Sequence, residues 1–468
     1  MTQNTQEPNV VFDLNLIHKY NKSGPRYTSY PTAVQFSPKL DDERYQQIAQ
    51  DTNEDPIPRP LSLYFHIPFC DTVCFYCACN KLATKNHALA GPYLEHVYRE
   101  LAMQSRLFDN DRQVEQLHWG GGTPTFLSHH EIRELMAVTR QNFHLADDST
   151  GEFSIEVDPR ETDAETVALL REVGFNRMSI GVQDFDPAVL KAVNRIQPRE
   201  VTLETLQSAR QYGFRSINLD LIYGLPMQTV ESFSRTLDEI IDLKPDRLSV
   251  FNYAHLPERF KPQRRIQVID LPSATDKLQI LQNTIRQLTD AGYVFIGMDH
   301  FARPDDELVQ AQREGRLHRN FQGYSTHAGC DLIGFGATSI GMVGDSYSQN
   351  LHRIDEYNAR IDAGRLAVYH GIELNRDDLI RREVITQLMC HFQIQTDTLS
   401  ATLGIDFWEY FQREKMALQP MLQDGMIVMS RSGIQVTPSG RLLIRNICME
   451  FDHYLNQPDN ITRFSRVI

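Results

Sequence analysis

The sequence predicts an α/β fold: a partial (open) βα barrel with six parallel strands plus an extension, followed by a mainly α-helical C-terminal domain. From residue 61 onward, short apolar runs alternate with amphipathic stretches of helical length. This alternation is typical of parallel strands joined by helical crossovers. It repeats six times, whereas a closed barrel of this kind has eight repeats, so we expect an open, partial barrel.

Length and charge narrow the class of protein. The chain has 468 residues, which favours two or three domains. Its net charge of −14 argues against non-specific binding to nucleic acid or anionic membranes. No apolar run approaches the ~20 residues that a membrane span needs, and the N-terminus lacks the pattern of a signal peptide. Seven cysteines, an odd number with four in one loop, fit a reducing cytoplasm, where we expect the protein to act. We also expect a monomer.

The elements follow in order along the chain. Residues 1–60 are polar, proline-rich and irregular, and we expect an N-terminal segment that covers the substrate. Residues 61–365 are predicted to form the catalytic barrel domain. Its strands are predicted at 61–67, 114–119, 152–157, 177–182, 216–222 and 247–253. The helices between them are predicted at 93–108, 131–143, 163–173, 199–212 and 230–243.

An extension and a second domain complete the chain. The extension is predicted as a helix at 275–291, a strand at 293–298 and an apolar segment at 331–341. Residues 366–468 are predicted to be mainly helical and winged-helix-like. They carry a hairpin at 426–429 and 432–436 and a last helix near 438–455. Given the acidic net charge, we expect a lid or packing domain rather than a DNA-binding one.

Four of the seven cysteines lie within ten residues, directly after the first predicted strand. They are Cys70, Cys74, Cys77 and Cys79, and the first three are spaced C-x3-C-x2-C. Thiolates this close on one loop can hold a polynuclear iron site. A cubane cluster would take four thiolates, so three leave one iron open to a ligand that is not protein. Zinc is a weaker alternative, because no second Cys or His pair follows to close a tetrahedron.

Polar groups also stand at the ends of the later strands. The second strand closes on the triple glycine 120–122, which lets backbone approach a ligand but is equally typical of a plain turn. Glu156 and Asp220 end later strands and can bind ribose hydroxyls or an α-ammonium group. Arg195 can bind a carboxylate through two hydrogen bonds. Together these side chains suit a zwitterionic nucleoside, such as an amino acid joined to adenosine.

The same residues carry a family resemblance. The C-x3-C-x2-C spacing after a first barrel strand resembles that of the radical S-adenosylmethionine enzymes. The longer string from Tyr64 to Lys81 is similar to the oxygen-independent coproporphyrinogen III oxidase (coproporphyrinogen dehydrogenase) family. Residues 24–31, 297–307, 320–324 and 464–468 also match that family. A haem-trafficking chaperone of the same superfamily is the alternative, against which Cys79, the N-terminal segment and residues 320–324 argue.

The resemblance implies roles for individual residues. Cys70, Cys74 and Cys77 would ligate a [4Fe–4S] cluster whose open iron is chelated by S-adenosylmethionine, and Cys79 would not be a ligand. The family binds two S-adenosylmethionine molecules. Positions for the first match Tyr64, Gly121, Glu156 and Ile340, and positions for the second match Tyr76, Gly122, Thr123, Gln183, Arg195, Asp220 and Ala254. The positions associated with activity match His66, Glu156 and Gln322. The family often has Phe and Gly where this chain has Tyr76 and Ala78.

The implied activity is anaerobic oxidative decarboxylation in haem biosynthesis. Two propionate side chains of coproporphyrinogen III would become vinyl groups, giving protoporphyrinogen IX, while S-adenosylmethionine is cleaved to methionine and 5′-deoxyadenosine. The expected partner is a reducing electron-donor protein, with no nucleic acid and no membrane span. Lys22, Arg26 and Arg303 are candidates for binding substrate carboxylates, because basic side chains pair with them.

Overall fold

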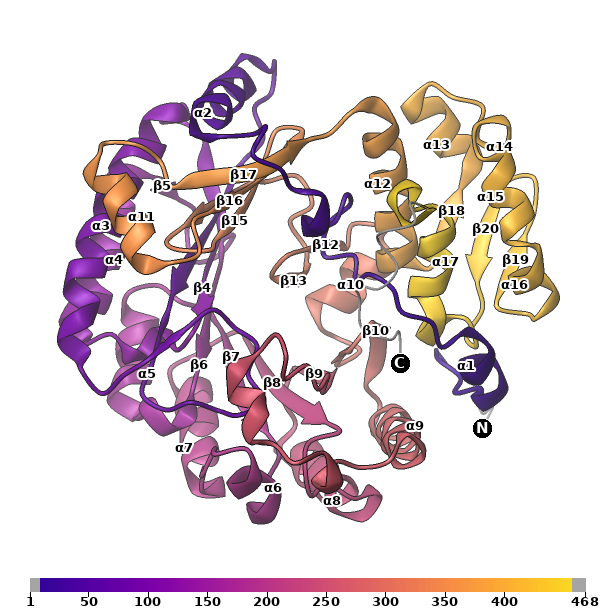
Figure 1. Cartoon of the computed structure of the whole chain (residues 1–468), viewed down its shortest axis with the longest axis horizontal. Helices are drawn as coiled ribbons and strands as arrows, with labels where there is room; N and C mark the ends of the chain where they lie inside the picture. The colour runs from indigo at the N-terminus through magenta and orange to yellow at the C-terminus, as the bar shows by residue number, and fades with distance from the viewer. Residues whose placement is uncertain (1–8, 457–468) are drawn as a thin grey trace. The chain divides into compact units, whose positions relative to one another are not determined.

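The computed structural model describes residues 9–456, which form two compact units (Figure 1). The barrel unit comprises Gln35–Lys277 and Gly329–Glu373. The helical unit comprises the described residues within Met1–Val34, Leu278–Ala328 and Leu374–Ile468. The division into three functional domains at residues 60 and 365 stays a prediction, and residues 464–468, part of the family resemblance, lie outside the described residues.

A largely parallel sheet forms the core of the barrel unit. Among the described residues of this unit its strands follow the order β9-β8-β7-β6-β4-β1-β14-β15-β16-β17. The six predicted strands are β1 (Leu61–Ile67), β4 (Gln113–Gly121), β6 (Glu152–Val157), β7 (Arg177–Gln183), β8 (Ser216–Tyr223) and β9 (Arg247–Asn252). The extension is β14 (Asp331–Phe335), parallel to β1, and the antiparallel β15 (Ile340–Val343), β16 (Ser346–Asn350) and β17 (Val368–Glu373). The predicted fold class is confirmed.

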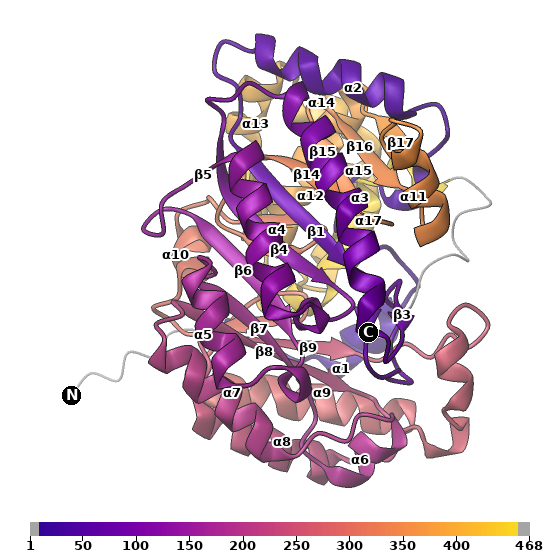
Figure 2. The same ribbon diagram turned by 90° about the vertical axis from the view of Figure 1, so that its left-hand side faces the viewer.

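Helices cover the outer face of this sheet, as Figures 1 and 2 show for α3, α4 and α5. They are α3 (Ala90–Gln104), α4 (His129–Asn142), α5 (Ala164–Glu172), α6 (Pro187–Ala192), α7 (Arg199–Gln211), α8 (Val230–Leu243) and α11 (Ile354–Asp362). The chain enters α4 through a capping box, in which Ser128 and Glu131 satisfy each other's backbone N–H groups. Between sheet and helices the core is aromatic: Phe65 stacks on Phe335 with ring centroids 4.8 Å apart, and Trp119 is fully buried.

The inner face of the sheet is polar at every second position. Tyr64 pairs with His118 on the neighbouring strand, and Ser179 pairs with both Glu156 and Asn218. Each of these side chains is half-buried, whereas the residues between them along each strand are buried. Since alternate residues of a strand point to opposite faces, the polar residues share one face and the apolar ones pack under the helices. This face leads to the C-terminal ends of the strands.

The helical unit surrounds the predicted hairpin. Its elements are α1 (Leu14–Tyr20), β10 (Val294–Gly297), β11 (His300–Ala302), α10 (Glu307–Arg313), β12 (His318–Asn320), β13 (Gly323–Ser325), α12 (Arg376–His391), β18 (Gln393–Gln395), α13 (Thr396–Leu403), α14 (Phe407–Tyr410), α15 (Gln412–Ala417), α16 (Gln419–Gln423), β19 (Ile427–Met429), β20 (Gly433–Val436) and α17 (Ile444–Glu450). The hairpin is confirmed as β19 and β20, with β18 added at the edge of β20. The predicted helix at 275–291 is α9 (Ala274–Asp290).

Two expectations about local structure were wrong. Residues 9–60, the described part of the N-terminal segment, are not irregular, because they contain α1 and α2 (Asp42–Asp51), each begun by an aspartate N-cap, Asp13 and Asp41. The last helix is shorter than 438–455, because the chain turns at Gly440, whose N–H bonds to the carbonyl of Thr437, before α17 begins. Among the described helices none is long and apolar enough to cross a membrane.

Candidate active site

The cysteines lie on a loop whose two ends are tied together. We call residues 70–81 the cysteine loop. The short strands β2 (Phe69–Cys70) and β3 (Leu82–Ala83) pair beside it, and Thr84 donates its N–H to the carbonyl of Cys70 at 2.9 Å. Within the loop, the N–H of Phe75 bonds to the carbonyl of Val193 at 2.9 Å. These bonds fix the loop at the end of β1, so the positions of its thiols are set by the barrel.

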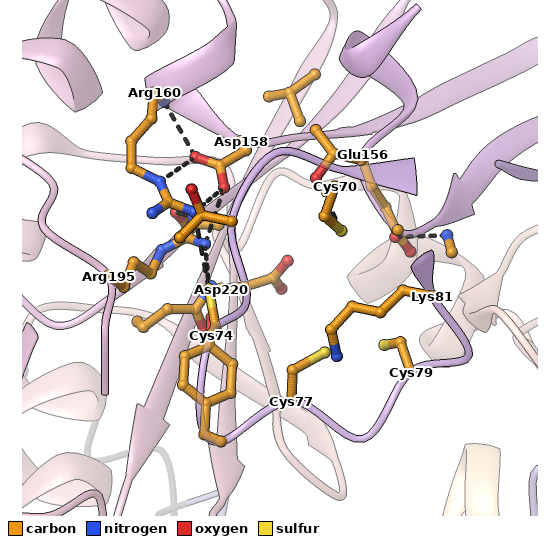
Figure 3. A pocket seen from close by; sticks show the side chains of 18 of the residues that line it. Cys70, Cys74, Cys77, Cys79, Lys81, Glu156, Asp158, Arg160, Arg195 and Asp220 are labelled. Atoms are coloured by element: carbon orange, nitrogen blue, oxygen red, sulfur yellow. Dashed lines mark hydrogen bonds and ion pairs between the residues drawn. The ribbon is translucent and has the colours of Figure 1, made fainter. Parts of the chain in front are cut away.

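A solvent-open cavity of about 190 Å³ lies between the cysteine loop and the ends of β4, β6, β7 and β8 (Figure 3). Residues predicted from separate strand ends converge on it. Those that line it are Cys70, Cys74, Tyr76, Cys77, Gly121, Gly122, Thr123, Glu156, Gln183, Arg195 and Asp220. Cys79, which is exposed, lines it too.

The thiols of the loop differ in their acidity. Burial raises the pKa of Cys70 to about 11, and the Thr123 hydroxyl lies 3.5 Å from its sulfur. A hydrogen bond from the Cys79 thiol lowers the pKa of Cys77 to about 5. Burial opposes the charge of Lys81, yet the neighbouring Cys77 raises the pKa of its ammonium overall. Figure 3 shows the Lys81 side chain pointing toward Cys77, so this end of the loop favours a thiolate.

Two guanidinium groups meet the sulfur of Cys74. Arg195 Nη1 lies 3.5 Å from Cys74 Sγ, and Arg160 Nη2 lies 3.7 Å from it. The carboxylate of Asp158 receives hydrogen bonds from both, at 3.0 Å and 2.6 Å (Figure 3). Burial opposes the ionisation of Asp158, but the two arginines lower its pKa below the ordinary value. Two guanidinium groups and one carboxylate therefore carry a net positive charge next to the sulfur of Cys74.

A carboxylate on β6 faces the cavity. Glu156 accepts a hydrogen bond from the N–H of Gly121 at 3.3 Å and lies 3.2 Å from Nε2 of His118. Burial opposes its ionisation, but these partners lower its pKa, so Glu156 is charged at neutral pH. The ring of Tyr64 stacks on the ring of His118, with the two centroids 5.8 Å apart.

A second carboxylate, Asp220 on β8, is held by neighbours on the same face of the sheet. Ser179 and Asn218 each donate a hydrogen bond to it at 2.8 Å. Burial raises its pKa to about 6. Glu156 and Asp220 thus place two acidic acceptors on the strand side of the cavity, opposite the thiols.

The triple glycine is required by the packing of the loop. Gly121 has a φ of +109°, and a Cβ there would lie 2.5 Å from Nδ1 of His66. A Cβ on Gly122 would lie 2.5 Å from the carbonyl oxygen of Phe69. Any side chain at either position would therefore push β4 away from the segment that begins the cysteine loop.

These residues fit the groups that the sequence predicts. Three thiols on one cavity can ligate an iron–sulfur cluster with one open iron. Acidic acceptors suit the hydroxyl and ammonium groups of S-adenosylmethionine, and a guanidinium suits its carboxylate.

Five of the predicted cofactor-binding and activity residues do not line the cavity. Tyr64 and His66 lie behind Gly121, where the Tyr64 hydroxyl is 3.2 Å from His66 Nδ1 and burial lowers the pKa of His66. Ile340 begins β15, and its carbonyl lies near Gly334, which pairs with Tyr64. Ala254 is exposed just after β9. The last predicted residue, Gln322, belongs to the helical unit, between β12 and β13.

Sequence interpretation missed two residues of the site, His118 and Arg160. The signal for His118 was present, because it lies two residues before Gly120 on β4 and so shares a face with it. Arg160 follows β6 in a short 3₁₀ turn, and nothing in its spacing marks it.

Comparison with known proteins agrees with this geometry. The family model of the Radical SAM superfamily matches residues 64–240, which span β1 to α8 and contain the three cysteines. The model of the HemN C-terminal domain matches residues 374–443 in the helical unit. The fold and site are those of a radical S-adenosylmethionine enzyme.

Full-length relatives define the family. Oxygen-independent coproporphyrinogen III oxidase of Pseudomonas aeruginosa is 54% identical over 459 residues, covering 98% of this chain and 99% of that protein. The Escherichia coli relative of the same name is 51% identical, with the same coverage. A solved structure, coproporphyrinogen III oxidase (HemN) from Escherichia coli, a radical SAM enzyme, matches with a TM-score of 0.90 at 49% identity. It covers 95% of this chain and 100% of that one. The chain belongs to the oxygen-independent coproporphyrinogen III oxidase family. This membership does not support the alternative of a haem-trafficking chaperone.

Proposed function

We propose that this chain converts coproporphyrinogen III to protoporphyrinogen IX without oxygen, by oxidative decarboxylation of two propionate side chains to vinyl groups. The observation that carries the proposal is the convergence of the loop thiols, including Cys70, Cys74 and Cys77, with the side chains of Glu156, Asp220 and Arg195 on one cavity. Full-length similarity to relatives named for this activity supports the choice of substrate.

The chemistry requires a radical that protein side chains alone do not supply. When bound, the reduced [4Fe–4S] cluster and S-adenosylmethionine supply a 5′-deoxyadenosyl radical, with methionine as the other product. Each propionate loses one β-hydrogen atom to that radical, then carbon dioxide and one electron, and a vinyl group remains. The electron passes to an external acceptor, so each decarboxylation is balanced.

The residues of the barrel unit bind and orient the reactants. Cys70, Cys74 and Cys77 are the proposed cluster ligands, and Cys79 is proposed to support Cys77 through its hydrogen bond. Glu156 is charged and exposed to the cavity, which suits a ribose hydroxyl or an ammonium group of the first S-adenosylmethionine. Asp220 and Arg195 are proposed to bind the second molecule. Burial keeps His66 neutral at neutral pH, so it can hold Tyr64 without adding charge.

Basic side chains of the helical unit are proposed to bind the substrate carboxylates. Arg26 forms an ion pair with Asp299, and Arg303 with Asp305 at 3.2 Å. A guanidinium carries five N–H donors in a planar fork that matches a carboxylate. We propose the same role for Lys22, and we place Gln322 among the residues needed for turnover. Residues 1–60 are proposed to cover the substrate.

The reaction also implies partners and a compartment. A reducing protein must deliver one electron for each S-adenosylmethionine cleaved. An odd number of cysteines and a predicted oxygen-sensitive cluster fit the cytoplasm. We propose that the chain acts there as a monomer.

An anaerobic assay tests the function directly. Enzyme with a reconstituted cluster is mixed with S-adenosylmethionine, a reductant and coproporphyrinogen III, and products are separated by chromatography. We expect protoporphyrinogen IX and 5′-deoxyadenosine to form in a ratio of one porphyrin to two nucleosides. Formation of 5′-deoxyadenosine without any vinyl product would refute the proposed substrate.

A further inference from the structure

A positively charged loop follows β9 in the barrel unit. We call residues 259–265 the basic loop; they read Arg-Phe-Lys-Pro-Gln-Arg-Arg. Four of these seven residues are basic, and the acidic residues that flank them along the chain are Glu258 and Asp270. The basic side chains are all exposed. Since the chain as a whole carries a net charge of −14, this loop is a local exception to an acidic surface.

The basic loop rests on the cysteine loop. The buried side chain of Gln263 donates a hydrogen bond to the carbonyl of Tyr76 at 3.0 Å. The guanidinium of Arg265 lies over the ring of Phe75, 5.5 Å from its centroid. Both contacts fall between the second and third cysteines, Cys74 and Cys77. The positive charge is therefore held next to the proposed cluster ligands by direct contacts.

A groove separates the exposed parts of the two loops. Cys77, Cys79 and Lys81 line one side, and Phe260 and Lys261 line the other. Among the described residues that line this groove there is no carboxylate, and none of the acidic strand-end residues of the cavity. The groove thus reaches Cys77 and Cys79 from a side that carries none of the acidic residues proposed to bind S-adenosylmethionine.

Exposed apolar residues flank the basic loop. Val268 is 70% exposed and Ile269 is 91% exposed. Met227, 50% exposed, joins them, because its N–H bonds to the carbonyl of Asp270 at 2.7 Å. Basic residues beside exposed apolar ones are typical of a protein interface, whereas a site for a small charged ligand does not need the apolar part.

We propose that the basic loop and its apolar flank form the docking surface for an acidic one-electron carrier protein that reduces the cluster. The proposal rests on the proposed function, since only an enzyme with a cluster needs the electron. The carrier gives up one electron and the cluster gains one, so the step is balanced. A basic surface steers an acidic partner to it and speeds association at low salt. The groove brings such a partner close to Cys77 and Cys79, which keeps the distance for electron transfer short.

The test measures cluster reduction without substrate. Reconstituted enzyme is mixed anaerobically with a reduced, acidic plant-type [2Fe–2S] ferredoxin in a stopped-flow spectrometer, and cluster absorbance is followed. In parallel, oxidised ferredoxin is titrated into the enzyme by calorimetry. The test variant is Lys261→Glu with Arg264→Glu. Arg265 is kept because of its contact with Phe75. The milder single change Lys261→Glu serves as a second variant, in case the double change disturbs folding.

A matched control carries the same change of charge elsewhere. Arg106→Glu with Lys244→Glu alters two exposed residues of the barrel unit. They precede β4 and β9, whereas the cysteine loop and the basic loop follow the C-terminal ends of β1 and β9. The control therefore changes the net charge at the opposite ends of the strands.

We expect the test variant to be reduced by ferredoxin at least about tenfold more slowly at low salt, with affinity weakened in proportion. The difference should shrink to about twofold at high salt, because screening removes the steering. Reduction by dithionite and the rate of the control variant should stay unchanged. Equal ferredoxin rates in test variant, control and unaltered enzyme would overturn the proposal. So would a test variant changed only in its KM for coproporphyrinogen III, which would assign the loop to substrate carboxylates. A failure of the proposed function would appear as the absence of a vinyl product in the assay with coproporphyrinogen III. It would leave the rates of cluster reduction unaffected, because that measurement contains no porphyrin.

Discussion

Arg160 places a guanidinium nitrogen 3.7 Å from the sulfur of Cys74, although the two residues follow different strands. Asp158 orients this guanidinium through a hydrogen bond of 2.6 Å and shares its carboxylate with Arg195 (Figure 3). Hydrogen bonds and positive charge at a cysteine sulfur stabilise the reduced, more negative state of an iron–sulfur cluster. Arg160 is therefore a positioning and tuning residue of the proposed cluster.

Replacing Arg160 should lower the reduction potential of the cluster. For Arg160→Gln we expect a decrease of about 60 mV, a tenfold change for a one-electron couple. The measurement is an anaerobic redox titration followed by electron paramagnetic resonance. Arg160→Lys keeps the charge and should lower the potential by less. An unchanged potential with a lower melting temperature would make Arg160 a structural residue only.

The ligand assignment predicts different iron contents for neighbouring cysteines. Cys74→Ser should lose the cluster, and Cys70→Ser and Cys77→Ser should do the same. Cys79→Ser is the matched control in the same loop: Cys79 is exposed and is not a proposed ligand, so the variant should keep a full iron complement. Iron and sulfide analysis after anaerobic reconstitution measures the outcome. A cluster in Cys74→Ser, or none in Cys79→Ser, contradicts the assignment.

Arg26 provides a test of substrate binding in the N-terminal segment. Arg26→Gln should raise the KM for coproporphyrinogen III about tenfold or more, because a hydrogen bond between charged groups is worth about 1.5–3 kcal/mol. Cluster content should not change. Deleting residues 1–35 is a less clean experiment, since it also removes the buried Tyr27 and Tyr30. If KM stays constant while the melting temperature falls, the pair of Arg26 with Asp299 is structural.

The fold was predictable from the sequence wherever the periodicity of apolar residues alone determines the secondary structure. Each predicted barrel strand agrees with the observed one to within two residues at each end, because apolar runs between turn residues have few alternatives. The helices α1 and α2 were missed because prolines surround them, although Asp13 and Asp41 mark their N-caps. The last helix was predicted to be longer than it is, because an apolar pattern with helical spacing continues through the turn at Gly440.

The site was predictable in part. Spacing and strand ends identify the cysteines, Glu156 and Asp220, since chemistry on parallel strands collects at their C-terminal ends. Ala254, Ile340 and Gln322 came only from the family resemblance. Arg160 could not be found, because its contact with Cys74 depends on how Asp158 folds back after β6. Tertiary contacts of this kind leave no periodic signal in a sequence.

A buried carboxyl group outside the cavity should make stability depend on pH. Glu100 is fully buried and accepts hydrogen bonds from Tyr357, Asn350 and the N–H of Gly336. Burial raises its pKa from 4.5 to about 7. Between these values the folded state binds more protons than the unfolded state, so the free energy of unfolding falls as pH rises from 4.5 through 7.

The variant Glu100→Gln should remove this part of the pH dependence. A shift of this size corresponds to about 3 kcal/mol, fully present below pH 4.5 and lost above pH 7. The amide cannot ionise, so its free energy of unfolding should lack that decline. Anaerobic urea unfolding at pH 5, 6, 7 and 8 compares the two proteins, and Glu43→Gln, an exposed carboxyl of α2, is the control. Parallel pH profiles for Glu100→Gln and the unaltered chain would show that Glu100 is ionised in the folded state throughout this range.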